Sequence, residues 1–594
     1  MLLWLACFGV DVEPGGRPGG PVPDSETGSP NDSPSDRAVD SAVDTAVGGC
    51  GASGSPGTAV APLLPASSLE GAAEPAEPLD GQAFAEPEGA DDPLHAFAGR
   101  LRFQATTESR TVHEADPWFT RDYTHAPLPA FDVELVTCGR DVLPTTRGRV
   151  QADDQDIWDL FVGPGRTWST PHDAGLTRVA LPFSLGFKWI NCVFNGLLTF
   201  VHDGASVSQV RWQITQETCH LLKLDAWGQA EATVVAGVDD AVEAAAIDAW
   251  QAELAARPEV RSFEQLAVDH PGVDLDAFDL GLTLADLSAR GLLVDDVLYL
   301  DRCRTRTGED PFCQNLVLPS FSLAKTTYTG LGLAAMAQEF EPDPYAQTLG
   351  GLLGAEGTWA EVTLENVIDM ATGHYLFDDQ ADVAVPGFYE SLDLAGRLQA
   401  TYALPQQVDP GEKVVYLTPN SGLAAAAMDA YLEQVGSPVT DSFDYLVDRV
   451  LRPAGLTEES FQSLRTWEAG GENNGTGFGG YGLWFTPHGI GALGAFLQRG
   501  GDGVLHPDRL ADTLMQTADR GPSLSYYGYS YNNAMWGYPV AGCSDVVAPI
   551  LFGVSGISVV LPPNGTVYFA FTDAQEYQVV NVLEQTAAIA PHCE

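Results

Sequence analysis

The chain has 594 residues, of which 45% are hydrophobic, and its formal net charge is −52. A chain of this length predicts roughly two or three domains and at least one large core. The negative charge excludes recognition of nucleic acid or of an anionic membrane surface through charge. The composition favours an acidic, solubilising surface.

Residues 1–93 predict an export signal followed by a tether, with no folded domain. The apolar start ends in Leu5, Ala6 and Cys7 and is similar to the end of a bacterial lipoprotein signal, although it lacks a basic first segment. The residues that follow are rich in Gly, Pro, Ser and Asp and contain too few large apolar side chains to form a core. We therefore expect a periplasmic or cell-surface lipoprotein attached to the membrane through lipidated Cys7, or a secreted protein, with Cys50 unpaired in a disordered tether.

Eight cysteines remain when Cys7 is set aside, an even number that is compatible with disulfides in an oxidising compartment. The expected pairs are Cys192–Cys219, Cys303–Cys313 and Cys543–Cys593. The sequence contains no C-x-x-C motif, which argues against a zinc ribbon or a thioredoxin-like site. No apolar run reaches the length of a membrane-spanning helix.

Short runs of alternating apolar and polar residues dominate residues 94–236 and predict antiparallel strands separated by turns. No nucleophile, metal cluster or phosphate-binding loop stands out there, and we interpret this stretch as an all-β accessory domain. Residues 237–292 change to helical spacing and predict a connecting segment with helices at 239–257 and 283–290. The acidic residues 269–276 within it are spaced unlike a calcium-binding loop, so no metal site is predicted.

One serine–lysine pair stands out in the second half of the chain. The sequence LPSFSLAK, at residues 318–325, opens an alanine- and leucine-rich run that predicts a helix to residue 339. Ser322 and Lys325 are three residues apart and therefore share one face of that helix. Unpaired N–H groups and the helix dipole create positive potential in the first turn, which favours a neutral amine that can take the proton of Ser322. A serine here also serves as a helix N-cap, although Ser320 can fill that place instead.

Five further landmarks follow the serine–lysine pair. They are VTLENVIDMATG (362–373), VYLT (415–418), FDYLVDRVLRPAG (443–455), GYGLWFTP (480–487), and FGVSGI (552–557) with VYFAF (567–571). In this order they resemble the serine β-lactamase-like, or penicillin-binding-protein-like, hydrolase family, which includes class C β-lactamases, D-alanyl-D-alanine carboxypeptidases, esterases and 6-aminohexanoate-dimer hydrolase. The resemblance covers about half of the chain. It implies that residues 293–594 form an α/β (α+β) domain of β-lactamase/transpeptidase-like fold, an antiparallel sheet flanked by helices.

The resemblance also implies a role for each matching residue. Ser322 would be the nucleophile, Lys325 the general base, and Tyr416 the group that orients this pair and gives a proton to the leaving group. The oxyanion hole would consist of the backbone N–H groups of Ser322 and Ile557. The implied substrate-binding residues are Thr418, Ser555 and Gly556.

Two departures from the family pattern narrow the expected substrate. Thr418 stands where the family has asparagine, and residues 554–556 read Val-Ser-Gly, without the Lys or His that the family carries there. The carboxylate of a β-lactam or of a cell-wall peptide would therefore lack a cationic partner at this strand. We expect a serine hydrolase that acts on an ester or a linear amide and needs no metal or organic cofactor. The alternative is a catalytically silent surface or binding protein that retains the fold.

Overall fold

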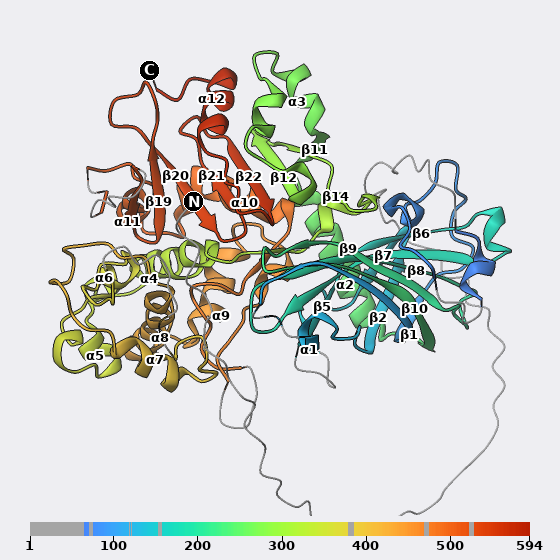
Figure 1. Cartoon of the computed structure of the whole chain (residues 1–594), viewed down its shortest axis with the longest axis horizontal. Helices are drawn as coiled ribbons and strands as arrows, with labels where there is room; N and C mark the ends of the chain where they lie inside the picture. The colour runs from blue at the N-terminus through green and yellow to red at the C-terminus, as the bar shows by residue number, and fades with distance from the viewer. Residues whose placement is uncertain are drawn as a thin grey trace, which may run out of the picture.

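The computed structural model describes residues 64–70, 75–117, 119, 121–151, 157–377, 385, 387–467, 474–518, 520–521 and 528–593 (Figure 1). Two large sheets organise these residues. A sheet of ten strands lies on the right in Figure 1, and a sheet of eight strands with most of the helices lies on the left. The predicted fold class, an antiparallel sheet flanked by helices and preceded by an all-β domain, is confirmed.

The ten-stranded sheet closes on itself. Its strands are β1 (Ala98–Ala115), β2 (Phe131–Cys138), β3 (Asp141–Pro144), β4 (Val150–Gln151), β5 (Trp158–Val162), β6 (Gly165–Trp168), β7 (Thr177–Phe187), β8 (Val193–His202), β9 (Val210–Thr218) and β10 (Leu222–Ala236). The order is β4-β5-β7-β6-β3-β2-β1-β10-β9-β8, and β7 also pairs with β8, so eight antiparallel strands form a continuous ring. We call residues 98–236 the ring domain. A long edge strand would expose many unpaired backbone N–H and C=O groups. Closing the sheet into a ring pairs these groups for the eight strands of the ring.

The prediction that residues 1–93 form a disordered tether is wrong for the described part of that range. Leu69 is buried against Val201 of β8, and Phe84 packs with Trp168 and Leu197 on the outside of the ring. Together with Ser288 and Arg306, which contact the end of β9, this cover buries β7, β8 and β9 along their whole length. The few apolar residues of the segment suffice because the ring supplies the rest of the core. Cys7 and Cys50 lie outside the described residues.

The eight-stranded sheet belongs to the second half of the chain. Its strands are β11 (Glu259–Ser262), β12 (Leu287–Val294), β13 (Val297–Leu300), β18 (Ser530–Asn532), β19 (Met535–Pro539), β20 (Val547–Gly553), β21 (Ile557–Val560) and β22 (Val567–Thr572). They follow the order β11-β13-β12-β22-β21-β20-β19-β18, and all neighbours are antiparallel except β11 and β13. We call residues 259–593 the C-terminal domain.

Helices cover both faces of this sheet, as the alternation of β22 shows. Val567, Phe569 and Phe571 join one core with helix α10 (Pro487–Gln498), whereas Tyr568 and Ala570 join another with α12 (Val580–Ile589). A strand whose successive side chains enter two cores must be apolar throughout. The remaining helices are α1 (Arg121–Thr124), α2 (Asp240–Ala256), α3 (Phe263–Asp269), α4 (Leu331–Glu339), α5 (Leu349–Leu353), α6 (Leu364–Ile368), α7 (Leu394–Tyr402), α8 (Thr418–Gln434), α9 (Ser442–Leu446) and α11 (Pro507–Thr513).

Residues 237–292 are not a purely helical connection, and the helix predicted at 283–290 is wrong. Helix α2 forms where expected, but β11 and β12 follow it and belong to the C-terminal sheet, which therefore begins before residue 293. All eight residues of β12 are buried between β13 and β22. Leu287, Ala289 and Arg290 favour a helix locally, and pairing with β13 and β22 overrides that preference. Gly291 permits the strand, because a Cβ there would lie 2.5 Å from the Phe569 ring.

The three predicted disulfides are present: Cys192–Cys219, Cys303–Cys313 and Cys543–Cys593. Cys138 is also disulfide-bonded. Disulfides are consistent with an exported chain. Within the described ranges, no helix has the length and apolar character needed to cross a bilayer.

Ion pairs and a buried carboxyl group lie where the ring domain contacts the C-terminal domain. Arg306 donates to both carboxylate oxygens of Glu217 at the end of β9, over 2.6 and 2.7 Å. Lys223 of β10 lies 3.0 Å from Asp286 and 3.7 Å from Asp573. Burial, followed by the nearby Glu217 carboxylate, raises the pKa of Asp573 to about 9. The joint therefore holds one carboxyl group that is protonated at neutral pH.

Asp573→Asn is expected to stabilise the protein at pH 8 by about 1 kcal/mol, the lower end of the range for a buried, incompletely bonded polar group. The folded state keeps the Asp573 proton at pH values where the unfolded chain has lost it, so wild-type stability falls as pH rises from about 4 toward 9. A permanently neutral amide removes this loss of stability, so the stabilisation by Asp573→Asn should shrink as the pH falls toward 4. Thermal unfolding across this range measures it, with exposed Asp296→Asn as control. A lower unfolding midpoint for Asp573→Asn at pH 8 would contradict the prediction.

Candidate active site

The predicted nucleophile lies at the entrance of a buried helix. Strand β16 (Leu318–Pro319) pairs with β17 (Trp484–Phe485), and the chain then turns at residues 321–322. The helix starts at Leu323, passes through a π-helical turn at Lys325–Gly330 and continues as α4. Residues 323–336 are all buried, including Lys325 and three threonines of the π-helical turn. Ser322 is half-buried, so its hydroxyl group is at the edge of the core.

The turn before Ser322 has a strained backbone. Phe321 has a φ angle of +40°, a region that bulky residues rarely occupy and that costs on the order of 1–3 kcal/mol. Its backbone N–H donates a 2.7 Å hydrogen bond to Oδ1 of Asn191, a fully buried residue of the ring domain. Strain of this kind persists only where neighbouring groups enforce it, and Asn191 is such a group.

Lys325 brings three predicted site residues together. Its Nζ lies 2.7 Å from Oγ of Ser322 and 2.9 Å from Oγ1 of Thr418, the first residue of α8. The same Nζ lies 4.6 Å from the centre of the Tyr416 ring, within the range of a cation–π contact. Lys325 is 1% exposed, so its amine acts inside the protein and not in water.

Tyr416 contacts the site through its ring face. The ring packs against Trp536 at 5.1 Å and against Tyr531 at 5.6 Å between centroids, which fixes its plane. Among the described residues, no hydrogen bond joins its hydroxyl group to Ser322 or Lys325. The ring position is therefore defined by the structure, and the proton-donating role of the hydroxyl stays a prediction.

The turn between β20 and β21 lies directly against the nucleophile turn. A Cβ on Gly553 would lie 2.9 Å from the carbonyl oxygen of Ser320, so only glycine permits this approach. Ile557, the predicted second oxyanion donor, is fully buried and pairs with Gly553 across the hairpin. Ser555 and Gly556 form the bend between them with φ angles of +80° and +95°. The oxyanion assignment stays a prediction.

The side chain of Ser555 is directed to the ring domain. Its Oγ accepts a 3.1 Å hydrogen bond from the His220 N–H and lies 2.8 Å from Nδ1 of the same residue. Burial, and then the charge of Lys223, lowers the pKa of His220 to about 4, so the ring is neutral at pH 7 and Nδ1 can accept the Ser555 proton. Ser555 was predicted to bind substrate; in this structure its hydroxyl group accepts from the His220 N–H and donates to Nδ1 of the same residue.

The sequence analysis missed Asn191 and His220. Asn191 Oδ1 also accepts from the Ser320 hydroxyl and the Gly482 N–H, and its Nδ2 donates to the Leu483 carbonyl. Both missed residues flank cysteines whose pairing the sequence did predict, Cys192 and Cys219. That position beside a disulfide was the one available signal.

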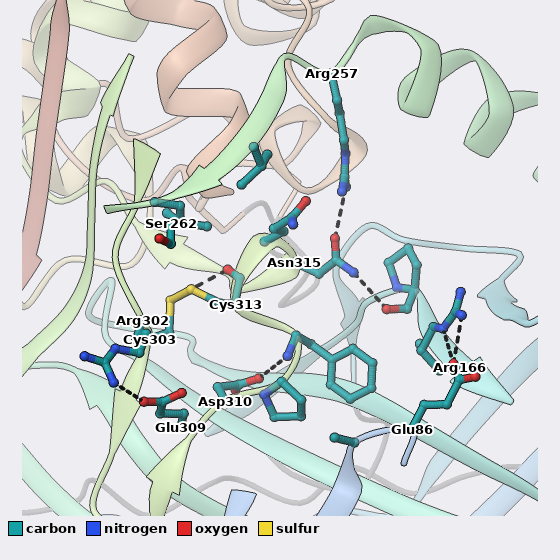
Figure 2. Close-up of a pocket in the computed structure, with 18 of the residues that line it drawn as sticks. Glu86, Arg166, Arg257, Ser262, Arg302, Cys303, Glu309, Asp310, Cys313 and Asn315 are labelled. Carbon is teal, nitrogen blue, oxygen red and sulfur yellow. Dashed lines mark hydrogen bonds and ion pairs between the residues drawn. A yellow bond between two sulfur atoms is a disulfide. The ribbon is translucent and has the colours of Figure 1, made fainter. Parts of the chain in front are cut away.

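A cavity of about 360 Å³ lies at the joint between the two domains and is separate from this site (Figure 2). Its lining comes from residues 85–86, the ring domain, α2 with Arg257, β11 and residues 300–315, and does not include Ser322. Its arginines already have partners: Arg166 pairs with Glu86, Arg257 with Asn315, and Arg302 with Glu309. Asp310 is buried in the wall, and burial raises its pKa to about 7.

Comparison with solved structures returns two hydrolases and a penicillin-binding protein among its matches. EstCE1, a hydrolase with promiscuous acyltransferase activity, is similar with 16% identity and a TM-score of 0.39 over 56% of this chain and 99% of its own. A penicillin-binding protein from Bacillus halodurans (14%, TM-score 0.38) matches over 55% and 99%, and a D-stereospecific amidohydrolase from Streptomyces sp. (16%, TM-score 0.38) matches over 53% and 99%. No protein-family model and no curated protein matches the chain.

Proposed function

We propose that this chain is a serine hydrolase that forms an acyl-enzyme on Ser322 and transfers the acyl group to water. The observation that carries the proposal is the 2.7 Å contact between Lys325 Nζ and Ser322 Oγ at the entrance of a buried helix. A nucleophile and a base within hydrogen-bonding distance, with the base held by a third group, is the arrangement that covalent catalysis needs. Thr418 is that third group here, 2.9 Å from the amine.

In the acylation step, Oγ of Ser322 attacks the substrate carbonyl while its proton passes to the amine of Lys325. The carbonyl oxygen becomes an oxyanion, for which we propose the N–H groups of Ser322 and Ile557 as donors. The bond to the leaving group then breaks, and that group takes a proton, which we assign to Tyr416. Water then attacks the acyl-enzyme and gives a proton to Tyr416, the bond to Ser322 Oγ breaks to release the acid, and Lys325 returns its proton to Ser322.

The substrate class follows from the turn that faces the nucleophile. Residues 554–556 contain no cation, and the hydroxyl of Ser555 is bound to His220. Nothing in this turn offers a charged partner to a carboxylate, so an uncharged ester or linear amide is favoured over a β-lactam. Gly556 and Thr418 remain the proposed contacts near the scissile bond.

A fluorophosphonate probe tests the proposal directly on the whole chain. Covalent labelling is expected, with the mass of the probe on the peptide that contains Ser322, together with hydrolysis of p-nitrophenyl esters. A chain that neither takes the label nor hydrolyses esters and linear amides would overturn the proposal and favour a silent binding or surface protein.

Tyr416→Phe is expected to slow hydrolysis of an anilide or an alkyl ester by about 10²-fold, the usual contribution of a positioned general acid. The phenylalanine ring retains the packing against Trp536 and the face toward Lys325, and only the proton donor is lost. A p-nitrophenyl ester has a leaving group that departs without a proton and should therefore lose much less. Steady-state kinetics on a matched pair of substrates measures the difference. Equal losses on both substrates would contradict the role of the Tyr416 hydroxyl.

A further inference from the structure

Two loops of the ring domain reach the candidate active site from opposite sides of one disulfide. Asn191 immediately precedes Cys192, and His220 immediately follows Cys219. These cysteines close the end of the β8–β9 pair, where Val193 pairs with Thr218. The disulfide therefore fixes the distance between the two residues that contact the C-terminal domain here.

We infer that Asn191 and His220 are positioning residues for the Ser322 site, and that the ring domain acts as a rigid clamp on the two turns that form it. Asn191 holds the nucleophile turn and His220 holds the turn at residues 554–556. The inference rests on the proposed function, because positioning has meaning only where Ser322 reacts.

Asn191 acts on the strained turn. It is fully buried, and its side chain makes four hydrogen bonds to the C-terminal domain, three of them accepted by Oδ1. One of the three comes from the N–H of Phe321, the residue with positive φ that directly precedes the nucleophile. A single side chain thus enforces the turn and ties it to residues 482–483, which lead into β17.

His220 acts on the opposite turn. Its backbone N–H and its Nδ1 hold the Ser555 hydroxyl, and the Ser555 carbonyl accepts from Thr572 Oγ1, which anchors the bend to β22. The His220 ring also packs against the Phe321 ring, with 6.4 Å between centroids. His220 therefore contacts both turns, and the disulfide links it to Asn191. Displacing either turn changes the distance between the nucleophile and the proposed oxyanion donors, and an error near 1 Å lowers a rate by about 10²-fold.

The ring domain supplies matched controls for both residues. Asn195 of β8 is also a buried asparagine, but its side chain bonds only to Ser184 and Gln216 of the ring. His202 is also a buried histidine, and it bonds the Gly204 N–H inside the same domain. Asn191→Ala and His220→Ala can therefore be compared with Asn195→Ala and His202→Ala in the full-length oxidised protein. The readouts are the second-order rate of fluorophosphonate labelling, kcat and KM on a p-nitrophenyl ester, and the thermal unfolding midpoint.

We expect Asn191→Ala and His220→Ala to lower the labelling rate and kcat by about 10²-fold, whereas the two controls lower only the unfolding midpoint. Asn191→Asp retains the oxygen acceptor, and His220→Asn retains an acceptor near the position of Nδ1, so both should recover part of kcat. If Asn191→Ala does not fold, the comparison of His220→Ala with His202→Ala still tests the inference. A double variant, Cys192→Ser with Cys219→Ser, tests it in the same way. If the wild type is labelled and hydrolyses the ester, but Asn191→Ala and His220→Ala react as fast as their controls, this inference alone is overturned. If the wild type neither takes the label nor hydrolyses the ester, the proposed function is overturned as well.

Discussion

Ser322→Ala is expected to abolish fluorophosphonate labelling and to lower ester hydrolysis by at least about 10⁴-fold, because no other group can form the acyl-enzyme. The fold should tolerate the change, since Ser322 is half-buried and its hydroxyl contacts Lys325 at the edge of the core. The variant should therefore unfold within a few degrees of wild type. Labelling, steady-state hydrolysis and thermal unfolding, measured on the same preparation, separate lost chemistry from lost structure.

Ser558→Ala is the control for that experiment. Ser558 is fully buried in β21, beside the facing turn, and its hydroxyl oxygen has no hydrogen-bond partner among the described residues. Removing it should leave labelling and hydrolysis unchanged. Residual hydrolysis by Ser322→Ala at more than about one hundredth of the wild-type rate would place the nucleophile on another residue.

The sequence predicted the parts of the site that are local in the chain or carried by landmarks. Ser322 and Lys325 meet because a spacing of three residues in a helix places both side chains on the same face. Their contact therefore does not depend on tertiary packing. Thr418 is 93 residues from Lys325, and only the ordered landmarks placed it near the pair. The ring face that Tyr416 presents to the amine was not predictable, because Trp536 and Tyr531 fix its plane from a distant hairpin.

Asn191 and His220 show what sequence reasoning lacks. They contact residues 130 and 335 positions away, and nothing in their local pattern describes how two domains dock. The long strands of the ring domain were predictable because each is a short run of strand-favouring residues bounded by turn residues, which is a local property. Strand β12 was not, because Leu287, Ala289 and Arg290 favour a helix locally and pairing with β13 and the distant β22 overrides that preference. The packing of residues 64–70 and 75–93 was not predictable either, because their core is supplied by another part of the chain.

Lys325→Met is expected to lower kcat by about 10³-fold, because the Ser322 proton then has no base to accept it. The same substitution should raise the unfolding midpoint, since methionine fills a similar volume and removes a buried amine that needs polar partners. Lower activity together with higher stability is the signature of a residue retained for chemistry. Lys413→Met serves as a matched control and should leave kcat within about twofold of wild type.

Chemical rescue gives the sharper test of the same residue. Lys325→Ala leaves a small buried space beside Ser322 and Thr418, and an added primary amine such as ethylamine can occupy it and supply the missing base. We expect the rate of Lys325→Ala to rise with amine concentration, whereas Lys325→Met, with the space filled, should not respond. Retention of kcat by Lys325→Met within about tenfold of wild type would assign the base to a different group. A Lys325→Ala variant that is equally slow with and without amine, while Lys325→Met is more stable than wild type, would limit Lys325 to orienting Ser322.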